Sequence, residues 1–375
     1  MASKEQIIAA LRLINTYKIG AKKFYQLVED YGTITSAVDF VLAKGKYKPW
    51  SYEQAEIELK KVEAIDAKII LYSDDEYPAI LRNYNNAPPL LYVKGNITAL
   101  NFDSSIAIVG GRAASVNGRK TAAKIAKELT EEGVCIVSGM ARGIDASAHK
   151  GAMFAKGETG STIAVLGTGI DVIYPPENKD IYEQIQQNGC IISEFPIGTK
   201  AVASQFPQRN RVVAALSEAV LVVEAGINSG SLITAQFGSE MGKTIFAVPG
   251  TPGESRSQGA NYLIKKGAVL VEMSADILPF LKGNKKGEKV QKKQAIQKVL
   301  VFENNDVNYS EQENEQNIKD DSLISFLTVD GVSVDELIRL TGKDTSTIAM
   351  EILELELSGI AERRSGNKVA LINQD

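Results

Sequence analysis

The sequence has little of three features that many enzymes and membrane proteins need. Its single histidine, His149, means that no site in the chain can use two histidines for metal binding or catalysis. No run approaches the roughly 18 uninterrupted apolar residues of a membrane-spanning helix, and the first residues lack the apolar core of a signal peptide. The only cysteines, Cys135 and Cys190, lie in apolar, strand-like runs, where buried free thiols are expected rather than a disulfide or a metal pair. We therefore expect a cytoplasmic protein with no membrane contact and no metal site.

A strong excess of positive charge is also missing. The formal net charge of −4 argues against a protein that coats nucleic acid with its whole surface. It leaves room for a local basic groove, because phosphate binding depends on where the lysines and arginines lie. The length of 375 residues, with 44% hydrophobic and 23% charged residues, indicates a globular protein of two or three domains.

Four regions separate by pattern. Residues 1–66 read as short helices and predict an N-terminal helical domain of the helix-hairpin-helix or SAM-like type. Residues 67–281 alternate strand, loop and helix, and predict an extended Rossmann-like core. Residues 282–320 are polar with few apolar positions and predict a disordered linker. Residues 321–375 read as three helices and a hairpin that turns at 365–367, which is typical of a winged helix.

The N-terminal region contains a glycine turn that allows two interpretations. Gly20 separates two apolar helical stretches, and Gly32 is placed to end the second of them. In a helix-hairpin-helix the backbone N–H groups of such a turn can bind a phosphate. A small helical domain that only packs or mediates contacts is the somewhat favoured alternative, because the usual second glycine of the motif is missing.

The core predicts an α/β fold with a parallel sheet. Continuous apolar runs alternate with helical stretches, which is typical of a sheet covered on both faces. The runs cover residues 106–109, 134–137, 162–166, 190–192, 219–223, 244–248 and 268–271. In such sheets ligands bind at the carboxyl ends of the strands, where the strand order reverses.

The loops that follow these strands are rich in glycine and small polar residues. Glycine lets a backbone approach a ligand closely, and N–H groups at the next helix start attract anions. The predicted anion-binding residues of these loops are Gly110, Gly111, Gly167, Gly169, Ser229, Gly230 and Ser231. Neither the dinucleotide spacing G-x-G-x-x-G nor a P-loop is present. Arg112 in the first loop is predicted to hold a phosphate; a salt bridge to a neighbouring loop is the alternative.

A second candidate cluster precedes an apolar helix. It offers phosphate contacts, amide hydrogen bonds and a stacking platform, which are the needs of a single-strand site. Its predicted DNA-binding residues are Phe206, Gln208, Arg209, Asn210 and Arg211. Phe206 could instead be a hydrophobic staple for the helix, and that alternative stays open.

Catalysis is not supported by the sequence. His149 follows Asp145 by one helical turn, so the pair could act as a general base with its orienting carboxylate. A structural hydrogen bond, with Asp145 near the N–H groups of the first helical turn, is the favoured interpretation. No nucleophile has a convincing partner, so we predict no catalytic residue, no cofactor and no enzyme activity.

The winged helix is acidic. Acidic residues outnumber basic ones in residues 321–368, whereas a module that grips duplex phosphates needs a positive recognition face. Protein contact is therefore the favoured function of this domain, and duplex DNA binding the alternative.

Several motifs of the core, in this order, are similar to one known family. They are SGMARGID at 138–145, GTGIDVIYP at 167–175, SEFP at 193–196, FPQRNR at 206–211, SGSL at 229–232 and AVPG at 247–250. The chain resembles the DprA/Smf family over the whole core, and its helical start and winged-helix end agree with that family's arrangement.

The resemblance implies a protein that binds and protects single-stranded DNA during natural transformation and loads the RecA recombinase onto it, usually as a homodimer. The family's phosphate-binding arginine after the first strand corresponds to Arg112, and its aromatic and basic residues correspond to Phe206, Arg209 and Arg211. The family usually has Gly-Ser-Arg where this chain has Gly110, Gly111 and Arg112, which removes one hydroxyl donor. The rival hypothesis is a nucleotide-processing enzyme of the lysine-decarboxylase-like Rossmann group, whose Pro-Gly-Gly-x-Gly-Thr-x-x-Glu signature is missing.

Overall fold

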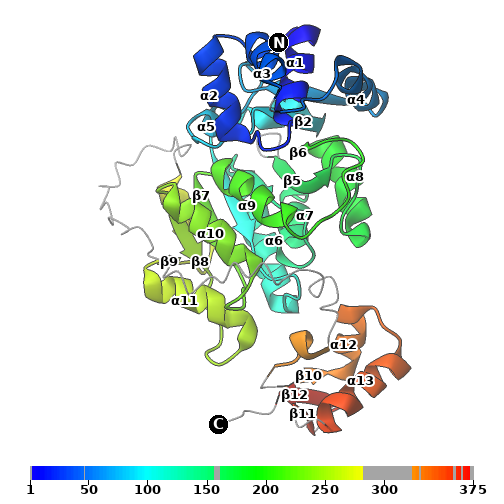
Figure 1. The fold of residues 1–375 in the computed structure, drawn as a ribbon. Coiled ribbons are helices and arrows are strands. Elements are labelled where there is room, and N and C mark those ends of the chain that lie inside the picture. Colours follow the sequence, from blue (N-terminus) through cyan, green and yellow to red (C-terminus); the bar gives the residue numbers. More distant parts are fainter. Residues whose placement is uncertain are drawn as a thin grey trace.

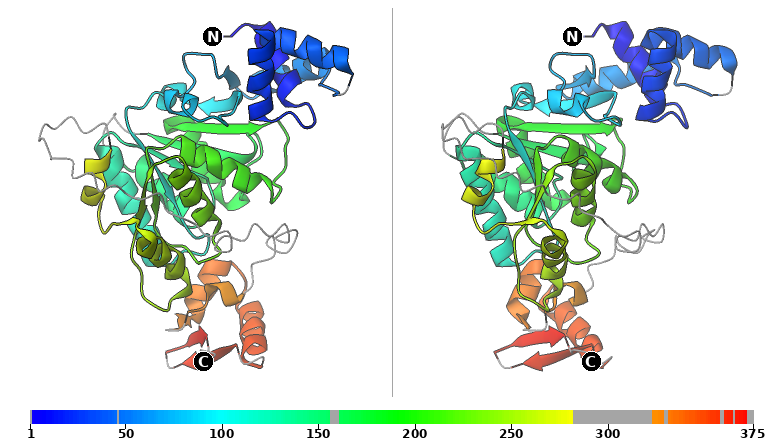
Figure 2. Two further views of the ribbon diagram at one scale, coloured as in Figure 1. Left: turned by 60° about the vertical axis from the view of Figure 1, so that its left-hand side comes forward. Right: turned by 90° about the vertical axis from the view of Figure 1, so that its left-hand side faces the viewer.

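The computed structural model describes residues 2–45, 47–155, 161–281, 323–328, 331–357, 360–364 and 366–371. Three parts follow one another along the molecule: an N-terminal helical domain, a central α/β core and a C-terminal winged helix (Figures 1 and 2). In each view the N-terminal helices and the winged helix lie at opposite ends, with the core between them. The predicted linker at 282–320 lies outside the described residues.

Four helices form the N-terminal domain: α1 (Lys4–Ile14), α2 (Ala21–Tyr31), α3 (Ile34–Lys44) and α4 (Tyr52–Ala64). Ser3 and Ser51 begin α1 and α4 with capping boxes, in which the serine hydroxyl and a glutamine side chain bind each other's backbone N–H. Gly32 ends α2 at φ +79°, as predicted, because glycine tolerates the left-handed region. Apolar residues of all four helices are buried together against the core.

A nine-stranded sheet forms the core, with the order β1-β2-β6-β5-β4-β3-β7-β8-β9. Its strands are β1 (Ala67–Leu71), β2 (Leu90–Gly95), β3 (Ser105–Val109), β4 (Cys135–Ser138), β5 (Thr162–Gly169), β6 (Cys190–Phe195), β7 (Ala219–Val222), β8 (Thr244–Ala247) and β9 (Val269–Leu270). Strands β3 to β9 are parallel, as predicted. Two further strands, β1 and β2, were not predicted; they extend one edge of the sheet in the antiparallel sense. The segment between them holds only the four-residue helix α5 (Ala79–Arg82), so the helical spacing that marks a parallel crossover is absent there.

Helices cover both faces of the sheet, as predicted. One face packs against α9 (Gln205–Ala215), α10 (Gly230–Glu240) and α11 (Gln258–Lys266), and the other against α6 (Val116–Glu131), α7 (Ile144–Met153) and α8 (Lys179–Asn188). Cys135 and Cys190 are buried free thiols within this core. Burial raises the pKa of both thiols, so both stay protonated.

The strand order reverses between β3 and β7. From β3 the chain builds outward through β4, β5 and β6 on one side, and through β7, β8 and β9 on the other. The loops after β3 and β7 therefore diverge at their carboxyl ends, which is where α/β sheets bind ligands.

The winged helix consists of a one-turn 3-10 helix η6 (Leu323–Phe326), β10 (Val332–Ser333), α12 (Val334–Thr341), α13 (Thr345–Leu357), β11 (Ala361–Arg364) and β12 (Lys368–Leu371). The predicted helices and hairpin are present, and the first helix is shorter than the others. Leu337, Ile348, Ile352 and Val369 are fully buried in a core of its own. Among the described residues of the whole chain, no helix combines the length and apolar character needed to cross a membrane.

Candidate nucleic-acid interface

Arg112 is the exposed cation of the loop that follows β3. Within the described part of the chain it forms no ion pair, so the alternative of a salt bridge to a neighbouring loop is not observed there. Its guanidinium lies over the ring of Phe206, 5.7 Å from the ring centroid. The two candidate clusters of the sequence analysis are therefore in contact, and the charge of Arg112 is free to meet an anion.

Phe206 lies at the start of α9 and is held from two further sides. The ring of Tyr174, from the loop after β5, lies 5.5 Å from it at an angle of 37°. Gly167 packs against the ring edge, since a Cβ at this position would lie 3.0 Å from a ring carbon. Arg112, Phe206 and Tyr174 thus form a row along the carboxyl edge of the sheet, which we call the aromatic row. Tyr174 was missed as a site residue, although an aromatic side chain in a strand-end loop is a signal that could have found it.

Glu224 occupies the helix start where a Rossmann protein binds pyrophosphate. Its carboxylate accepts hydrogen bonds from the Ser115 N–H at 2.8 Å and the Ser115 hydroxyl at 2.6 Å. A Cβ on Gly118 would lie 2.3 Å from this carboxylate, so the carboxylate of Glu224 lies directly against the first turn of α6. The Gly111 N–H donates to the Glu224 carbonyl at 2.6 Å. The partial positive charge of this helix end is therefore neutralised by the protein itself, in agreement with the absence of a dinucleotide motif.

Arg209 lies beneath the surface. The residue is only 6% exposed, and its Nη1 donates a hydrogen bond to the Val165 carbonyl at 3.2 Å. The guanidinium fills the space beside Gly139, where a Cβ would lie 1.3 Å from Nη1. Burial lowers the pKa of Arg209 to about 10, while the neighbouring Asp145 opposes that shift. The contacts of Arg209 are therefore internal ones.

The other polar residues predicted to bind DNA in this segment differ in their surroundings: Arg211 and Asn210 make contacts within the protein, whereas Gln208 lies at the surface. Arg211 pairs with Glu194 and donates to the Asn86 carbonyl at 2.6 Å. Burial raises the pKa of Glu194, and Arg211 opposes this rise. The Asn210 amide donates to the Gly230 carbonyl at 3.2 Å, which ties α9 to the start of α10. Gln208 is exposed.

The small residues of the strand-end loops have different surroundings. Ser229 caps α10, and its hydroxyl lies 2.8 Å from that of Ser231. Gly230 faces open space, with no atom within 4 Å of the place of a Cβ. Gly169 is closed in, since a Cβ there would lie 2.6 Å from the Pro196 carbonyl. Gly110 is closed in by Ile144 and the Glu224 carbonyl. Of these loops, the one at Gly230 leaves the most room for a ligand.

Asp145 and His149 have separate partners. Asp145 accepts hydrogen bonds from the N–H groups of Gly139 at 3.1 Å and Ala141 at 3.4 Å, in the loop before α7. His149 is fully buried, and Nδ1 lies 2.7 Å from the Thr162 hydroxyl. The expectation that the two residues form a hydrogen bond at the helix start is therefore wrong. The loop turns at Met140, which has φ +65°, and this brings the N–H groups on either side of it within hydrogen-bond distance of the carboxylate.

Because His149 is buried in its neutral form, we expect the free energy of unfolding to depend on pH. Burial lowers its folded-state pKa to about 3, and Arg209 acts in the same direction. Below an unfolded-state pKa of about 6.5, the unfolded chain binds a proton that the folded chain refuses. The free energy of unfolding should therefore fall by about 1.4 kcal/mol per pH unit between about pH 6.5 and 3 from this residue alone.

Denaturant titrations at pH 7 and pH 5 measure this effect, with His149→Gln as the comparison. The variant lacks the titrating group, so its loss of stability between the two pH values should be smaller than that of the wild type. Equal losses would show that His149 does not carry the effect.

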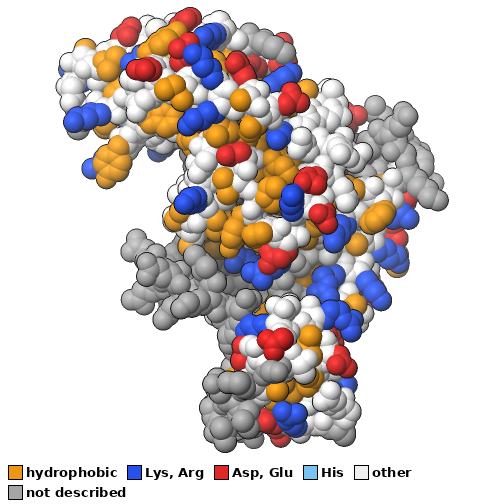
Figure 3. Space-filling model, turned by 90° about the vertical axis from the view of Figure 1, so that its right-hand side faces the viewer, with side chains coloured by type: hydrophobic (Ala, Val, Ile, Leu, Met, Phe, Trp, Pro, Cys, Tyr) orange, Lys and Arg blue, Asp and Glu red, His pale blue; other side chains and the backbone are white. Residues whose placement is uncertain are grey.

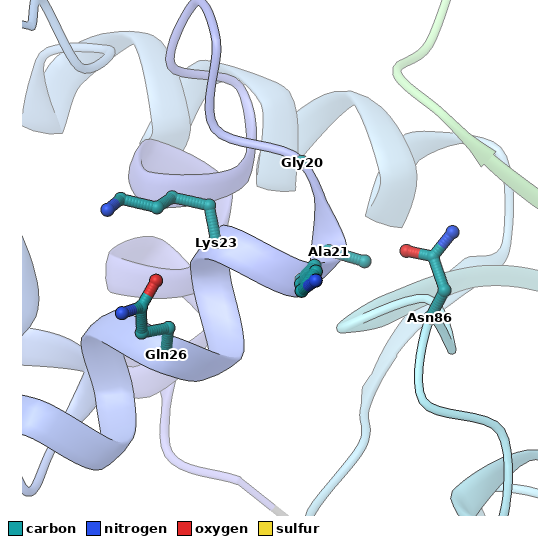
Figure 4. Close-up of a pocket in the computed structure, with 6 residues that line it drawn as sticks. Gly20, Ala21, Lys23, Gln26 and Asn86 are labelled. Carbon is teal, nitrogen blue, oxygen red and sulfur yellow. The ribbon is translucent and has the colours of Figure 1, made fainter.

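The glycine turn of the N-terminal domain opens a shallow pocket. Gly20 begins α2 without a side-chain cap, and the pocket is lined by Ala21, Lys22, Lys23 and Gln26 of that helix together with Asn86 of the core. In Figure 4 Lys23 and Asn86 extend to opposite sides and do not converge on one point. The phosphate-binding interpretation of this turn therefore gains no support from the side chains, and it stays a prediction.

Arg363 and Arg364, in the first strand of the winged-helix hairpin, are paired with acidic neighbours. Arg363 lies 3.2 Å from Glu356, and Arg364 lies 2.8 Å from Glu362. Lys343, before α13, lies 2.6 Å from Glu351. Their charge is already compensated locally, which favours protein contact over duplex DNA binding for this domain.

The sequence matches three family models. Residues 68–282 match the model described as DNA recombination-mediator protein A, residues 310–367 match the DprA winged helix domain, and residues 4–60 match the DprA-like N-terminal HHH domain. Within the described residues, no group of three His, Cys, Asp or Glu side chains is arranged to hold a metal ion.

Curated relatives and solved structures agree with this match. The chain is 43% identical over 205 residues to DNA processing protein DprA of Streptococcus pneumoniae, covering 55% of this chain and 71% of that protein. It is 41% identical over 211 residues to Protein Smf of Synechocystis, covering 56% of this chain and 52% of that protein. The chain thus matches about half the length of the latter relative. The X-ray structure of the S. pneumoniae protein superimposes with a TM-score of 0.62 at 33% identity, covering 74% of this chain and 98% of that one. DNA processing protein A of Helicobacter pylori, whose structure was described for its single-stranded DNA binding mode, gives 0.50 at 29% identity, covering 57% and 94%.

Proposed function

The chain belongs to the DNA recombination-mediator protein A (DprA/Smf) family, and from this premise we propose that it binds single-stranded DNA along the carboxyl edge of its core sheet. The observation that carries the proposal is the aromatic row. It presents the unpaired cation Arg112 next to Phe206 and Tyr174, at the reversal of strand order. A phosphate and an adjacent base are the ligand pair that a cation beside aromatic rings binds.

The proposed roles of the site residues follow from their exposure. Arg112 contacts phosphate, and the open loop at Ser229, Gly230 and Ser231 lets the DNA backbone approach. Gln208, being exposed, offers an amide to a base. Phe206 and Tyr174 stack with bases or hold Arg112 in place.

The remaining predicted residues shape this surface from below. Arg209, Asn210 and Arg211 fix the position of α9 through contacts with Val165, Gly230 and Glu194. Gly110, Gly167 and Gly169 allow neighbouring residues to pack closely against them, and the Gly111 N–H ties its loop to the Glu224 carbonyl.

Titration of the full chain with single- and double-stranded oligonucleotides of the same sequence, at two salt concentrations, tests the proposal. Tighter binding of the single strand is expected, because its bases are free to stack, and the affinity should fall as salt rises. Fluorescence anisotropy of a labelled oligonucleotide measures both. Equal affinity for the two forms would contradict a single-strand site.

The wider role that we propose is that of a cytoplasmic recombination mediator without enzyme activity. It protects incoming single-stranded DNA during natural transformation and loads the RecA recombinase onto it, and it acts as a homodimer. Its parts are the helical domain 1–66, the DNA-binding core 67–281, the linker 282–320 and the winged helix 321–375, which contacts a protein partner. Sedimentation of the full chain measures the dimer, and RecA filament formation on DNA coated with single-strand-binding protein measures the loading.

The rival enzyme hypothesis gains nothing from the geometry. A base needs an accessible position, whereas His149 is fully buried and separate from Asp145. Glu224, the carboxylate nearest the strand reversal, is used to cap α6. Release of a free base from a nucleoside monophosphate by the purified chain would revive the enzyme hypothesis.

A further inference from the structure

The winged helix is seated on two loops of the carboxyl edge. Ala113, the residue next to Arg112, packs against the apolar core of the winged helix. Arg256, in the loop after β8, donates from Nη2 to the Phe326 carbonyl at 2.5 Å. The loops after β3 and β8 flank the loop after β7, so the winged helix lies across the half of the edge that begins at Arg112. Figure 3 shows lysine and arginine side chains on the part of the core next to the winged helix.

The guanidinium of Arg256 has few hydrogen-bond partners in this arrangement. It forms no ion pair with any residue that the structure describes, and its Nε is buried without a hydrogen-bond partner. Its observed acceptor is a neutral backbone carbonyl. A phosphate oxygen would be a stronger acceptor, because it carries negative charge and a phosphate can meet the guanidinium with two parallel hydrogen bonds.

The winged helix can leave this position without unfolding. Its buried residues Leu337, Ile348, Ile352 and Val369 form a core of their own, and Ala113 packs against that core from outside. The separation between β3 and β8 is two strand spacings, or about 10 Å. A strand of DNA bound at Arg112 can therefore reach Arg256 within a few nucleotides.

We propose that Arg256 is a second phosphate-binding residue of the groove, which the winged helix covers in the free protein. Single-stranded DNA that continues past Arg112 binds Arg256 and displaces the winged helix. This inference rests on the proposed function, since it extends the same DNA path. It assigns the winged helix a second role, as a cover that DNA removes from its own binding surface.

Energy transfer between two dyes tests the displacement in the full chain. Lys124→Cys on α6 and Lys368→Cys on the winged helix place labels on exposed positions, and the native thiols Cys135 and Cys190 are buried and protonated. A dT oligonucleotide of about 16 nucleotides, long enough for a typical single-strand site, should abolish the transfer. Unchanged transfer at saturation would overturn the proposal.

Arg256→Ala tests the phosphate contact. Loss of the Phe326 contact also eases displacement of the winged helix, so the readout is the salt dependence rather than the affinity. The slope of log K against log salt should become shallower by about 0.7, the contribution of one single-strand phosphate. Lys265→Ala, a matched loss of charge at the far end of α11, should keep the wild-type slope.

A wild-type slope in Arg256→Ala would overturn the phosphate assignment. The anisotropy of the same oligonucleotide separates this failure from failure of the proposed function. If the wild type binds the oligonucleotide but keeps its energy transfer, only the inference fails. If the wild type does not bind it, the proposed function fails and the inference falls with it.

Discussion

Arg112→Ala is expected to weaken the binding of single-stranded DNA about tenfold or more and to leave the fold intact. A hydrogen bond to a charged group contributes about 1.5–3 kcal/mol, and each 1.4 kcal/mol is about a factor of ten in affinity. The slope of log K against log salt should become shallower by about 0.7. Inside the protein, the described contact of the side chain is its position over Phe206, so the free energy of unfolding should change by less than about 1 kcal/mol. Anisotropy titrations and denaturant unfolding measure the two quantities.

Lys124→Ala is the matched control for this loss of charge. Lys124 is an exposed residue of α6, 3.9 Å from Glu128, and its removal should leave both affinity and slope unchanged. An unchanged affinity in Arg112→Ala would show that the groove does not run past Arg112. An equal loss in both variants would mean that binding depends on total charge alone.

The fold could be predicted from the sequence wherever the hydrophobic pattern was continuous. The parallel strands gave apolar runs because both faces of the sheet are covered, and the glycine at position 32 marked a helix end. Strands β1 and β2 could not be predicted in this way, because no full helix separates them and the alternation of strand and helix that marks a parallel crossover is absent. Strand β2 is positioned by its pairing with β6, where Tyr92 lies opposite Ser193, and β1 is positioned by its pairing with β2; no local pattern records either pairing.

The site was predictable at the level of segments but not of side chains. Sequence alone places Arg112 after a strand and the 206–211 segment before a helix; the structure places that segment within the first turns of α9 and brings Phe206 together with Arg112. The sequence does not show which arginine of that segment points outward. Successive residues of α9 point in different directions around the helix axis, and which of them are buried depends on how the helix packs on the strands beneath it. The space left by Gly139 admits Arg209, and this relation between the loop after β4 and a residue of α9 is visible only in three dimensions.

Arg209→Met should therefore behave differently from Arg112→Ala: it should destabilise the fold strongly and change DNA binding little. Arg209 and Asp145 are both buried and carry opposite charges that attract each other, and removal of one buried charge costs up to about 3–5 kcal/mol when the other is left without compensation. Here that charge is Asp145, whose pKa is raised by burial and held down by Arg209. Without Arg209 this pKa rises further, so the loss of stability should shrink as the pH is lowered and Asp145 becomes protonated. Denaturant unfolding at several pH values measures the effect.

Two further variants separate a positioning role for Arg209 from a DNA contact. In Arg209→Met combined with Asp145→Asn, the neutral amide needs no cation, so the destabilisation should be smaller than the sum of the single changes. Arg142→Met, which removes a half-exposed arginine 3.8 Å from Glu177, should cost less than about 1 kcal/mol. If Arg209→Met kept wild-type stability and lost DNA binding as Arg112→Ala does, its guanidinium would have to leave the space beside Gly139 to reach the DNA. The two arginines would then act on the same phosphate path, and the distinction between a surface cation and a buried support would have to be abandoned.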